Sequence, residues 1–328
     1  ISHILSERKA EGERSTTSRA GSDRADTMAN TMRIGTHGRS LARASIPSVA
    51  RIHALMRIEG LVPVVDSSLA AQMAMAGVPV EPGTEVVDNP ALAGIDLFFS
   101  LGGDGTILDT VAKTGQSGIP VLGINLGRLG FLSSTREEGA LAAIQAVKEG
   151  RYTIQERSLI ALQGTDLANG ETLIGLNEMS VHKRDTSSML VVDAWVNDRF
   201  LSTFWSDGLI VATPTGSTAY SLSCGGPILD PSCDAMVITP ISPHNLNVRP
   251  IVVPGASILR LHAEAREDKY LVNIDSRGFI VGRSLDLHVR KAAHRARFVQ
   301  LEGTGFFNTL REKLGWGMDV RSAKMSER

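Results

Sequence analysis

The stretch from Phe98 to Thr106 constrains the fold of this chain more than any other part of the sequence. An apolar segment ends there, three glycines surround a single carboxylate, and a helix-like segment from Thr106 to Lys113 follows. Glycine lets the backbone turn tightly and bring its N–H groups against a ligand. A helix that starts directly behind such a turn adds oriented donors and a partial positive charge, which favours phosphate.

Asp104 lies inside this turn, between Gly103 and Gly105. A carboxylate repels phosphate, so phosphate binding alone does not explain it. A carboxylate beside a phosphate cradle is better explained as a proton acceptor for a substrate hydroxyl, or as a magnesium ligand. The combination indicates phosphoryl transfer.

Around this turn, short apolar segments alternate with amphipathic ones. The pattern predicts strands at 33–36, 61–65, 96–100 and 119–124, and helices at 46–59, 69–76, 106–113 and 137–149. Such alternation predicts an α/β fold with a parallel, Rossmann-like sheet covered on both faces. In these sheets ligands bind beyond the carboxyl ends of the strands, which is where Gly102–Thr106 falls.

The pattern changes after Gly150, where strand-like pieces recur with turn residues between them. We expect strands at 154–162, 179–182, 190–196, 209–213, 251–261, 270–274, 285–289 and 297–301, and one late helix at 307–314. Short strands spaced by turns predict an all-β region. We therefore expect a tail at 1–31, an α/β domain at 32–150, a β-rich domain at 151–300, and a C-terminal segment at 301–328 whose helix returns to the α/β domain.

Composition narrows the class of protein. Of 328 residues, 42% are hydrophobic and 21% charged, as in ordinary globular enzymes, and the net charge of −1 argues against a nucleic-acid partner. No apolar run approaches the ~20 residues that span a bilayer, so we expect no membrane association. Two cysteines, Cys224 and Cys233, are read as buried thiols in a reducing compartment, which favours the cytoplasm. The first thirty residues are polar, have no signal-peptide core, and are expected to be disordered.

A second glycine-rich turn, Gly123–Leu132, also follows a predicted strand. Two such turns on neighbouring parallel strands would face one crevice. Arg128 would supply a mobile positive charge to a phosphate chain, or it is a solvated surface arginine. Phe131 is read as a packing residue or, alternatively, as a ligand contact.

Three further segments carry polar groups suited to a nucleoside. Asn177 and Glu178 have the donors and acceptors that bind ribose hydroxyls, although the pair alone is typical of a turn. Asp207 begins an apolar strand that ends in the hydroxyl-rich turn Thr213–Tyr220, where Tyr220 offers a flat face to a purine. Asp275 is read first as a hairpin-turn residue and second as a ligand contact. No His, Cys or Asp grouping has zinc spacing, so any metal is expected to arrive with a nucleotide.

Taken together, these segments resemble the ATP-dependent NAD kinase family over nearly everything from Met32 to about Gly317. The resemblance rests on five segments in this order: Leu101–Thr106, Asn125–Leu132, Asn177–Glu178, Asp207–Gly208 and Thr213–Tyr220. The first alone also resembles diacylglycerol, sphingoid and phosphofructo-kinases. Trp205 and Ser206 depart from the family pattern, which often has a basic or small pair there, and Leu132 replaces an aromatic residue found in some relatives.

The resemblance implies an activity: transfer of the γ-phosphate of ATP to the 2′-hydroxyl of the adenosine ribose of NAD, giving NADP. It implies that Asp104 activates that hydroxyl. Residues implied to bind NAD are Gly105, Phe131, Asn177, Glu178, Asp207, Ser217, Thr218, Ala219, Tyr220 and Asp275. Residues implied to hold the phosphates of ATP are Gly102, Gly103, Thr106 and Arg128.

The resemblance further implies Mg²⁺ bound with ATP, no protein metal ligands, and a homodimer or homotetramer. Two other readings are open: a lipid or sphingoid kinase, which shares the first glycine turn, and a dinucleotide-sensing protein without activity. The lipid kinase would need an apolar pocket, which the hydroxyl-rich Thr213–Tyr220 segment does not offer. The sequence leaves open polyphosphate as a donor, NADH as an acceptor, and feedback by NADPH.

Overall fold

The computed structural model describes residues 31–127, 130–133, 135–164, 167–184, 189–265, 269–282 and 284–316. The expected disordered tail lies outside these residues, apart from Thr31. No helix in the described ranges is long and apolar enough to cross a membrane.

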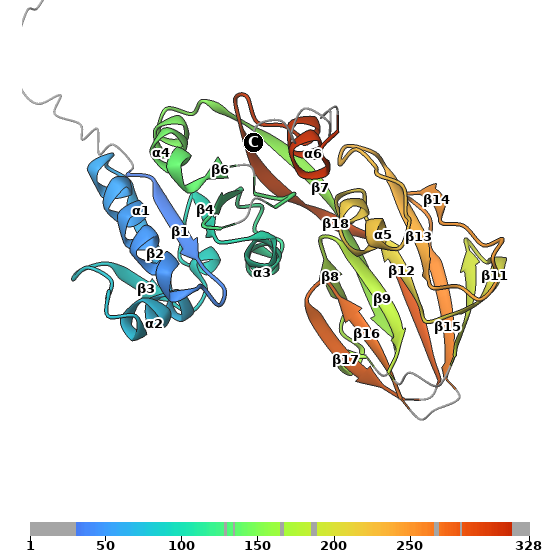
Figure 1. Ribbon diagram of the computed structural model, residues 1–328. Coiled ribbons are helices and arrows are strands. Elements are labelled where there is room, and N and C mark those ends of the chain that lie inside the picture. The colour runs from blue at the N-terminus through green and yellow to red at the C-terminus, as the bar shows by residue number, and fades with distance from the viewer. Residues whose placement is uncertain are drawn as a thin grey trace, which may run out of the picture. The chain divides into compact units, whose positions relative to one another are not determined.

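A parallel sheet forms the first part of the fold (Figure 1). Its strands lie in the order β3-β2-β1-β4-β5, and every neighbouring pair is parallel. Their bounds are β1 Arg33–His37, β2 Val62–Asp66, β3 Glu85–Val87, β4 Leu97–Leu101 and β5 Val121–Asn125. The strand order reverses between β1 and β4, and open α/β sheets bind ligands beyond the carboxyl ends of strands at such a point.

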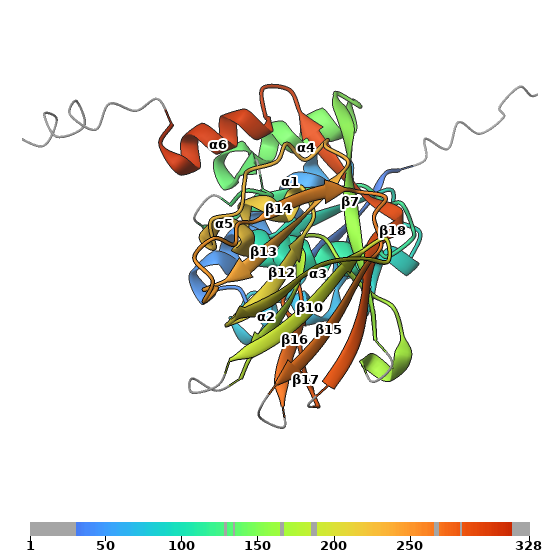
Figure 2. The ribbon, with the colours of Figure 1, turned by 90° about the vertical axis from the view of Figure 1, so that its right-hand side faces the viewer.

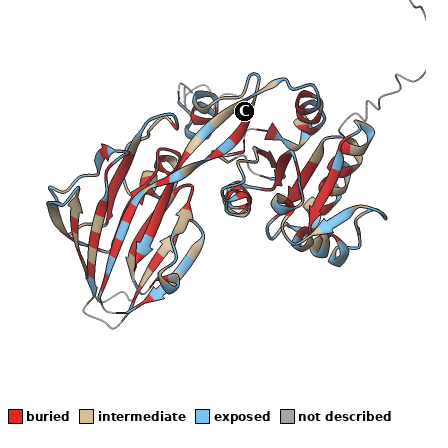
Figure 3. Cartoon of the chain, turned by 180° about the vertical axis from the view of Figure 1, so that it is seen from behind, coloured by how far each residue is buried: buried red, intermediate tan, exposed pale blue. Residues whose placement is uncertain are grey.

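Four α-helices accompany these strands: α1 Ile46–Ile58, α2 Ser67–Met75, α3 Asp104–Thr114 and α4 Ala140–Lys148. Strands β4 and β5 are buried at every position, because helices cover the sheet and its strands are continuous apolar runs (Figure 3). A two-residue strand, β6 Thr135–Arg136, pairs parallel with the last two residues of β5, Ile124 and Asn125. Short 3₁₀ helices lie at Arg43–Ser45, Pro90–Leu92, Glu137–Gly139, Ala168–Gly170 and Thr215–Thr218.

The same sheet continues into antiparallel strands. The long strand β18 (Ser284–Leu301) pairs parallel to β5 at Phe298 and Val121, and antiparallel to β7 (Tyr152–Gly164) along most of its length. On its other side follow β15 (Leu259–Ala265), β10 (Leu190–Val196) and β11 (Arg199–Ser206), while β8 (Leu173–Gly175) pairs with β7. One hydrogen-bonded sheet therefore spans both predicted regions.

A second, antiparallel sheet has the order β14-β13-β12-β9-β16-β17. Its strands are β9 Glu178–Lys183, β12 Gly208–Ala212, β13 Ala235–Ile241, β14 Ile251–Pro254, β16 Tyr270–Ile274 and β17 Arg277–Val281. A single apolar cluster joins it to the antiparallel strands of the first sheet, with members such as Leu162, Val181, Leu209 and Leu261. In Figure 2, strand β12 of this sheet lies beside β10 of the first sheet. Helices α5 (Tyr220–Ser223) and α6 (Phe306–Leu314) complete the fold.

The predicted fold class is confirmed, and several element predictions are wrong in detail. The strand expected at 251–261 is two strands, because the chain turns after Pro254. The strands expected at 285–289 and 297–301 are one, β18, with a register shift between Lys291 and Arg295. Helix α3 begins at Asp104, two residues earlier than expected. The two cysteines are free thiols, and Cys233 is exposed, so the prediction of two buried thiols is also wrong.

Candidate active site

The first glycine turn connects β4 to α3 and places Asp104 in the first turn of the helix. Gly102 has φ +148°, and a Cβ there would lie 2.4 Å from Thr106 Oγ1. A side chain at Gly102 would therefore clash with the helix start. Gly103 and Gly105 are exposed, whereas Thr106 is only 4% exposed. The carboxylate of Asp104 thus lies at the helix end where a negative charge is favoured.

The last residues of the second glycine turn, Phe131 and Leu132, bind Asp104. The backbone N–H of Phe131 donates to Asp104 Oδ2 (2.7 Å), and that of Leu132 donates to Oδ1 (3.0 Å). A Cβ on Gly130 would lie 1.8 Å from Asp104 Oδ1, so only glycine fits there. The two turns that the sequence placed on neighbouring strands thus meet at one carboxylate. Arg128, predicted to bind phosphate, lies outside the described residues.

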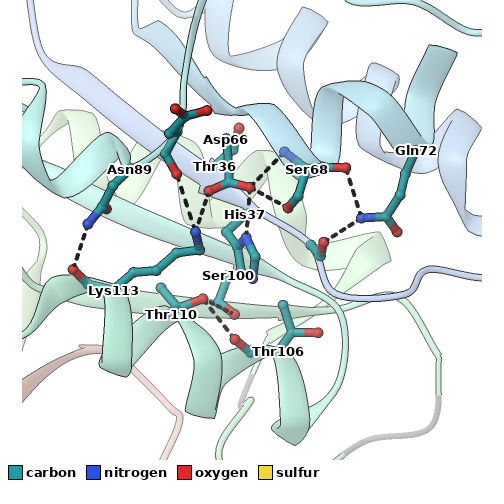
Figure 4. Close-up of polar contacts among 12 residues, drawn as sticks. Thr36, His37, Asp66, Ser68, Gln72, Asn89, Ser100, Thr106, Thr110 and Lys113 are labelled. Atoms are coloured by element: carbon teal, nitrogen blue, oxygen red, sulfur yellow. Dashed lines mark hydrogen bonds and ion pairs between the residues drawn. The ribbon is translucent and has the colours of Figure 1, made fainter.

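A buried polar cluster supports the other end of α3 (Figure 4). The fully buried Asp66 carboxylate accepts from the Ser68 backbone N–H (3.0 Å) and pairs with Lys113 Nζ (2.8 Å), near the end of α3. His37 Nδ1 lies 3.3 Å from the same carboxylate. Burial would raise the pKa of Asp66, but hydrogen bonds from His37, Lys113 and Ser68 outweigh it and hold the pKa well below its ordinary value. A charged Asp66 therefore ties α3 to the end of β2.

Asn177 and Glu178 lie at the start of β9, held there by Asp275. The Asp275 carboxylate accepts backbone N–H groups from Leu176 (2.7 Å), Asn177 (2.8 Å) and Glu178 (3.3 Å). Asp275 occupies the turn between β16 and β17 with φ +49°. Asp275 therefore lies in a hairpin turn, as expected. Its carboxylate also fixes the backbone of Asn177 and Glu178, the two residues expected to bind a ribose.

Two buried oxygens in this group have no hydrogen-bond partner among the described residues: Asn177 Oδ1 and Glu178 Oε2. Burial, and then the charge of Asp275, raise the pKa of Glu178 to about 8, although the Tyr220 backbone N–H opposes the shift. Buried polar atoms are nearly always paired in folded proteins. Unpaired oxygens here indicate a place for ligand hydroxyl groups.

The turn after β12 packs directly on Asn177. The Thr213 N–H donates to Asn177 O (2.8 Å), and a Cβ on Gly216 would lie 2.1 Å from that oxygen. Ser217 is fully buried, its hydroxyl donating to Pro214 O (2.7 Å) and accepting from the Leu229 N–H (2.9 Å). The Ser217 hydroxyl is therefore engaged within the protein. Thr218 Oγ1 donates to Thr215 O (3.2 Å) and is only partly buried.

Tyr220 follows Ala219 at the start of α5 and is 39% exposed. Its ring stacks on His182, with centroids 5.5 Å apart and planes at 19°. Asp207, just before β12, pairs with Lys183 (Oδ1 to Nζ, 2.6 Å). Sequence reasoning missed His182 and Lys183, because their partners become neighbours only when β9 pairs with β12.

Two further arginines were missed. Arg39 follows β1, and its Nη1 donates to Asp109 Oδ1 on α3 (3.1 Å) and to Ser276 Oγ in the β16–β17 turn (2.8 Å). Arg39 thereby joins helix α3 to the β16–β17 turn, which carries Asp275. Arg157 on β7 lines a small cavity with Phe131, and its Nη1 donates to Thr215 Oγ1 (3.4 Å). The position of Arg39 after a strand at the sheet's carboxyl edge was a usable signal.

The described residues contain no group of three or more His, Cys, Asp or Glu side chains placed to hold a metal ion. The site as described offers glycine turns at a helix start, one partly exposed carboxylate, and two unpaired buried oxygens beside an exposed aromatic ring. Together these features suit a phosphorylated nucleoside with free sugar hydroxyls.

Comparison with known proteins identifies the family. Residues 66–152 match the ATP-NAD kinase N-terminal domain, and residues 176–301 match the ATP-NAD kinase C-terminal domain. The NAD kinase of Cytophaga hutchinsonii is 38% identical over 87% of this chain and 98% of its own length. That of Flavobacterium johnsoniae is 38% identical over 89% and 100%.

Solved structures support the fold. The crystal structure of yeast NADH kinase complexed with NADH superposes with a TM-score of 0.77 at 22% identity, covering 88% of this chain and 89% of that one. An NAD kinase from Archaeoglobus fulgidus in complex with ATP gives 0.65 at 23% identity, covering 87% and 98%. The matched families are not those of lipid or sphingoid kinases. On its sequence and fold alike, the chain belongs to the NAD kinase family.

Proposed function

We propose that this NAD kinase transfers the γ-phosphoryl group of ATP to the 2′-hydroxyl of the adenosine ribose of NAD, with Asp104 as the general base. The observation that carries this proposal is the Asp104 carboxylate itself. It projects from the first turn of α3 and is held by two backbone N–H groups of the second glycine turn.

Asp104 is suited to accept a proton. Each carboxylate oxygen has two acceptor positions, and one N–H occupies one position on each. The remaining positions are free to accept from a substrate hydroxyl. A ribose hydroxyl is a weak nucleophile at neutral pH, and a positioned base accelerates such a step by about 10²–10⁴-fold.

The acceptor ribose is held, in this proposal, by Asn177 Oδ1 and Glu178 Oε2. Both oxygens are buried and unpaired in the described structure, so hydroxyl donors of a sugar would satisfy them. Thr218, Ala219 and the exposed face of Tyr220 would line the adenine. Asp207 and its partner Lys183 would meet the nicotinamide end.

The donor phosphates would lie against Gly102–Thr106 and the start of α3, assisted by Arg128. ATP would enter as its magnesium complex, with the ion held mainly by the phosphate oxygens. The metal's chemistry is to neutralise charge on the transferring group. Orientation and proton removal fall to the protein.

We also propose that the enzyme works in the cytoplasm as a homodimer or homotetramer. This proposal follows from the resemblance to the NAD kinase family, of which two members match 87% and 89% of this chain. Sedimentation of the purified chain measures its size directly. A monomer at all concentrations would contradict the oligomer.

The activity is tested by incubating purified protein with NAD and Mg–ATP and following NADP with an NADP-specific dehydrogenase. Phosphorus NMR of the product then locates the new phosphate. We expect a 2′-phosphomonoester on the adenosine ribose. Nucleotide binding without turnover would instead support the regulatory reading, and phosphorylation of sphingosine in place of NAD would support the lipid-kinase reading.

A further inference from the structure

Three side chains from three separate elements meet in one closed set of hydrogen bonds. Arg39 follows β1, Asp109 lies on α3, and Ser276 lies in the turn between β16 and β17. Arg39 Nη1 donates to Asp109 Oδ1 (3.1 Å) and to Ser276 Oγ (2.8 Å). Ser276 Oγ in turn donates to Asp109 Oδ1 (3.4 Å). We call these three contacts the Arg39 clamp.

The clamp joins the two regions of the proposed site by a short path. Asp109 lies five residues after Asp104 on α3, which is about 7.5 Å along a helix axis. Ser276 directly follows Asp275, whose carboxylate accepts the backbone N–H of Glu178. The clamp therefore connects the helix that begins with the proposed base to the turn that holds a proposed ribose-binding residue.

The backbone on both sides of Arg39 is held in place by α2. Gln72 Nε2 donates to Gly38 O (2.8 Å), and Gln72 Oε1 accepts from the Leu41 N–H (2.8 Å). A Cβ on Gly38 would lie 3.2 Å from Leu101 O, so glycine lets this segment pack close to the end of β4, the strand that leads into α3. Arg39 thus projects from a fixed segment, and its guanidinium is a fixed point of attachment for the other two side chains.

Apolar packing alone leaves the orientation of α3 against the β-rich region incompletely defined. Ile107 and Val111 of α3 share an apolar cluster with Leu176, and α3 and β8 lie next to each other (Figure 1). A cavity of about 310 Å³ nevertheless lies between these elements, lined by residues of α3, by β8 and by Asp275. Apolar contacts have no preferred direction, whereas hydrogen bonds do. The clamp supplies a directional contact at this boundary.

The clamp is too exposed to contribute much to the stability of the fold. The side chain of Arg39 is 42% exposed and that of Asp109 29%, and ion pairs this accessible to solvent stabilise a protein little. A contact of this kind shifts an equilibrium between two arrangements of the chain by about fivefold. That is a small change in folding, but a measurable one in the rate of a reaction that depends on geometry.

We propose that the Arg39 clamp is a positioning device, which sets the acceptor ribose at the distance from Asp104 that allows proton transfer. The proposal rests on the proposed function, in which the β-rich region holds NAD and the base lies at the start of α3. The three side chains act through Asp104 and Asp275, and binding of either substrate does not depend on them. Loss of the clamp therefore slows the reaction of bound substrates and leaves the affinity for each substrate unchanged.

The test removes the clamp by its least disruptive routes. Ser276→Ala deletes one oxygen from an exposed turn residue and leaves the Arg39–Asp109 ion pair intact. Arg39→Met removes the shared donor. Arg33→Met is the matched control, because Arg33 lies at the opposite end of β1 and pairs with Glu85, with side chains similarly exposed at 33% and 42%.

Three quantities are measured for each protein. The rate of NADP formation is followed in a single turnover with both substrates saturating, so that product release does not limit it. Calorimetry gives Kd for NAD and for the unreactive analogue adenosine 5′-(β,γ-imido)triphosphate. Urea unfolding gives the stability of the fold.

We expect Ser276→Ala and Arg39→Met each to slow the single turnover about fivefold, with both Kd values within about twofold of wild type. The double variant should be no slower than the slower single variant, because both changes break the same set of contacts. Arg33→Met should lose at least as much stability and keep the wild-type rate.

Asp109 gives the conservative comparison. Asp109→Asn keeps an oxygen that can accept from Arg39 and Ser276, so its rate should stay within about twofold of wild type. Asp109→Leu has no such oxygen and should be as slow as Ser276→Ala. Equal rates in the two Asp109 variants would contradict a role for this acceptor.

Single-turnover rates within about twofold of wild type in both Ser276→Ala and Arg39→Met would overturn the proposal. So would a weakened Kd for either substrate, which would make these side chains substrate contacts, or an equally slow Arg33→Met, which would indicate a general loss of stability. A wild-type protein that forms no NADP would contradict the assigned reaction and the clamp with it. An active wild type with equally active clamp variants would contradict the clamp alone.

Discussion

Asp104 and Glu178 are the central carboxyl groups of two differently built regions. Asp104 follows a turn at the end of a parallel strand, is partly exposed, and accepts hydrogen bonds from two backbone N–H groups. Glu178 begins a strand of an antiparallel sheet, and its buried Oε2 is unpaired. Burial and the nearby Asp275 raise the pKa of Glu178 to about 8.

The difference indicates a division of labour. A partly exposed carboxyl group in the first turn of a helix can take a proton from a substrate, whereas a carboxyl group kept neutral by burial can hold a sugar through hydrogen bonds. In each region a second segment holds the carboxyl residue in place. The backbone N–H groups of Phe131 and Leu132 bind the Asp104 carboxylate, and the Asp275 carboxylate binds the backbone N–H of Glu178.

The largest expected effect is on the Asp104 side. Asp104→Asn removes the proton acceptor but keeps the shape and the hydrogen-bonding capacity of one oxygen. We expect kcat to fall by about 10²–10⁴-fold, with the Kd for NAD little changed. Steady-state NADP formation and NAD titration measure both. Asp109→Asn, on the same helix, is the control and should cost less than tenfold; equal losses in the two variants would remove the special role of Asp104.

The support beneath α3 is the next test. Lys113→Met leaves the buried Asp66 carboxylate without its cation, and we expect a loss of roughly 3 kcal/mol in the free energy of unfolding. Lys148→Met breaks a pair with Glu59 at the surface and should leave the free energy of unfolding close to the wild-type value. Urea unfolding compares them. Similar losses would show that the Asp66 cluster does not anchor the helix.

Gly130 tests the contact between the two glycine turns. A methyl group in Gly130→Ala would lie where Asp104 Oδ1 is now, so the loop or the carboxylate must move. A misplacement of about 1 Å typically costs 10²-fold in rate, and we expect a loss of kcat on that scale. Gly127→Ala is the control, since its Cβ would lie an ordinary 3.9 Å from Asn125 Oδ1. A fully active Gly130→Ala enzyme would contradict the described geometry.

Glu178 tests the other region. Glu178→Leu leaves a ribose hydroxyl unpaired, and we expect KM for NAD to rise about tenfold with kcat changed less. Glu178→Gln should stay within about threefold, because a protonated carboxyl group and an amide both donate and accept. If Gln were as damaging as Leu, the ionised carboxylate would be the binding form.

The raised pKa of Glu178 also predicts a pH dependence of stability. A group whose pKa is higher in the folded state than in the unfolded state contributes most below the unfolded value, near 4.5, and loses that contribution as pH rises towards about 8. Wild-type protein should therefore lose stability between pH 5 and 8 relative to Glu178→Gln. The loss of stability of the wild-type protein relative to Glu178→Gln should not exceed about 5 kcal/mol. Parallel pH profiles of the two proteins would contradict burial of an ionisable Glu178.

The smallest expected effect concerns Tyr220. Tyr220→Leu keeps an apolar side chain but removes the flat ring, and we expect KM for NAD to rise about fivefold with kcat unchanged. Tyr220→Phe should behave as wild type. A Phe variant as impaired as the Leu variant would show that the hydroxyl matters and the stacking face does not.

Much of this architecture could be predicted from local patterns. The parallel strands are continuous apolar runs, and both glycine turns follow such runs, so the fold class and the location of Asp104 came from neighbouring residues alone. The missed length of β18 has a physical cause: its middle, Arg290–Arg295, is polar and contains a register shift, which hides the strand period.

What could not be predicted depends on pairing between distant segments. The hydrogen bonds that the backbone N–H groups of Phe131 and Leu132 donate to Asp104, and that of Glu178 donates to Asp275, join residues that no local period relates. Arg39 is similar, since its link to Ser276 exists only once the sheet has formed.

The most direct test of the central claim is the structure of the protein with NAD bound. The account predicts a carboxylate oxygen of Asp104 at about 2.6–3.2 Å from the 2′-oxygen of the adenosine ribose, or joined to it by a single water. An Asp104 carboxylate beyond that reach, with the 2′-hydroxyl bound by another group, would contradict it.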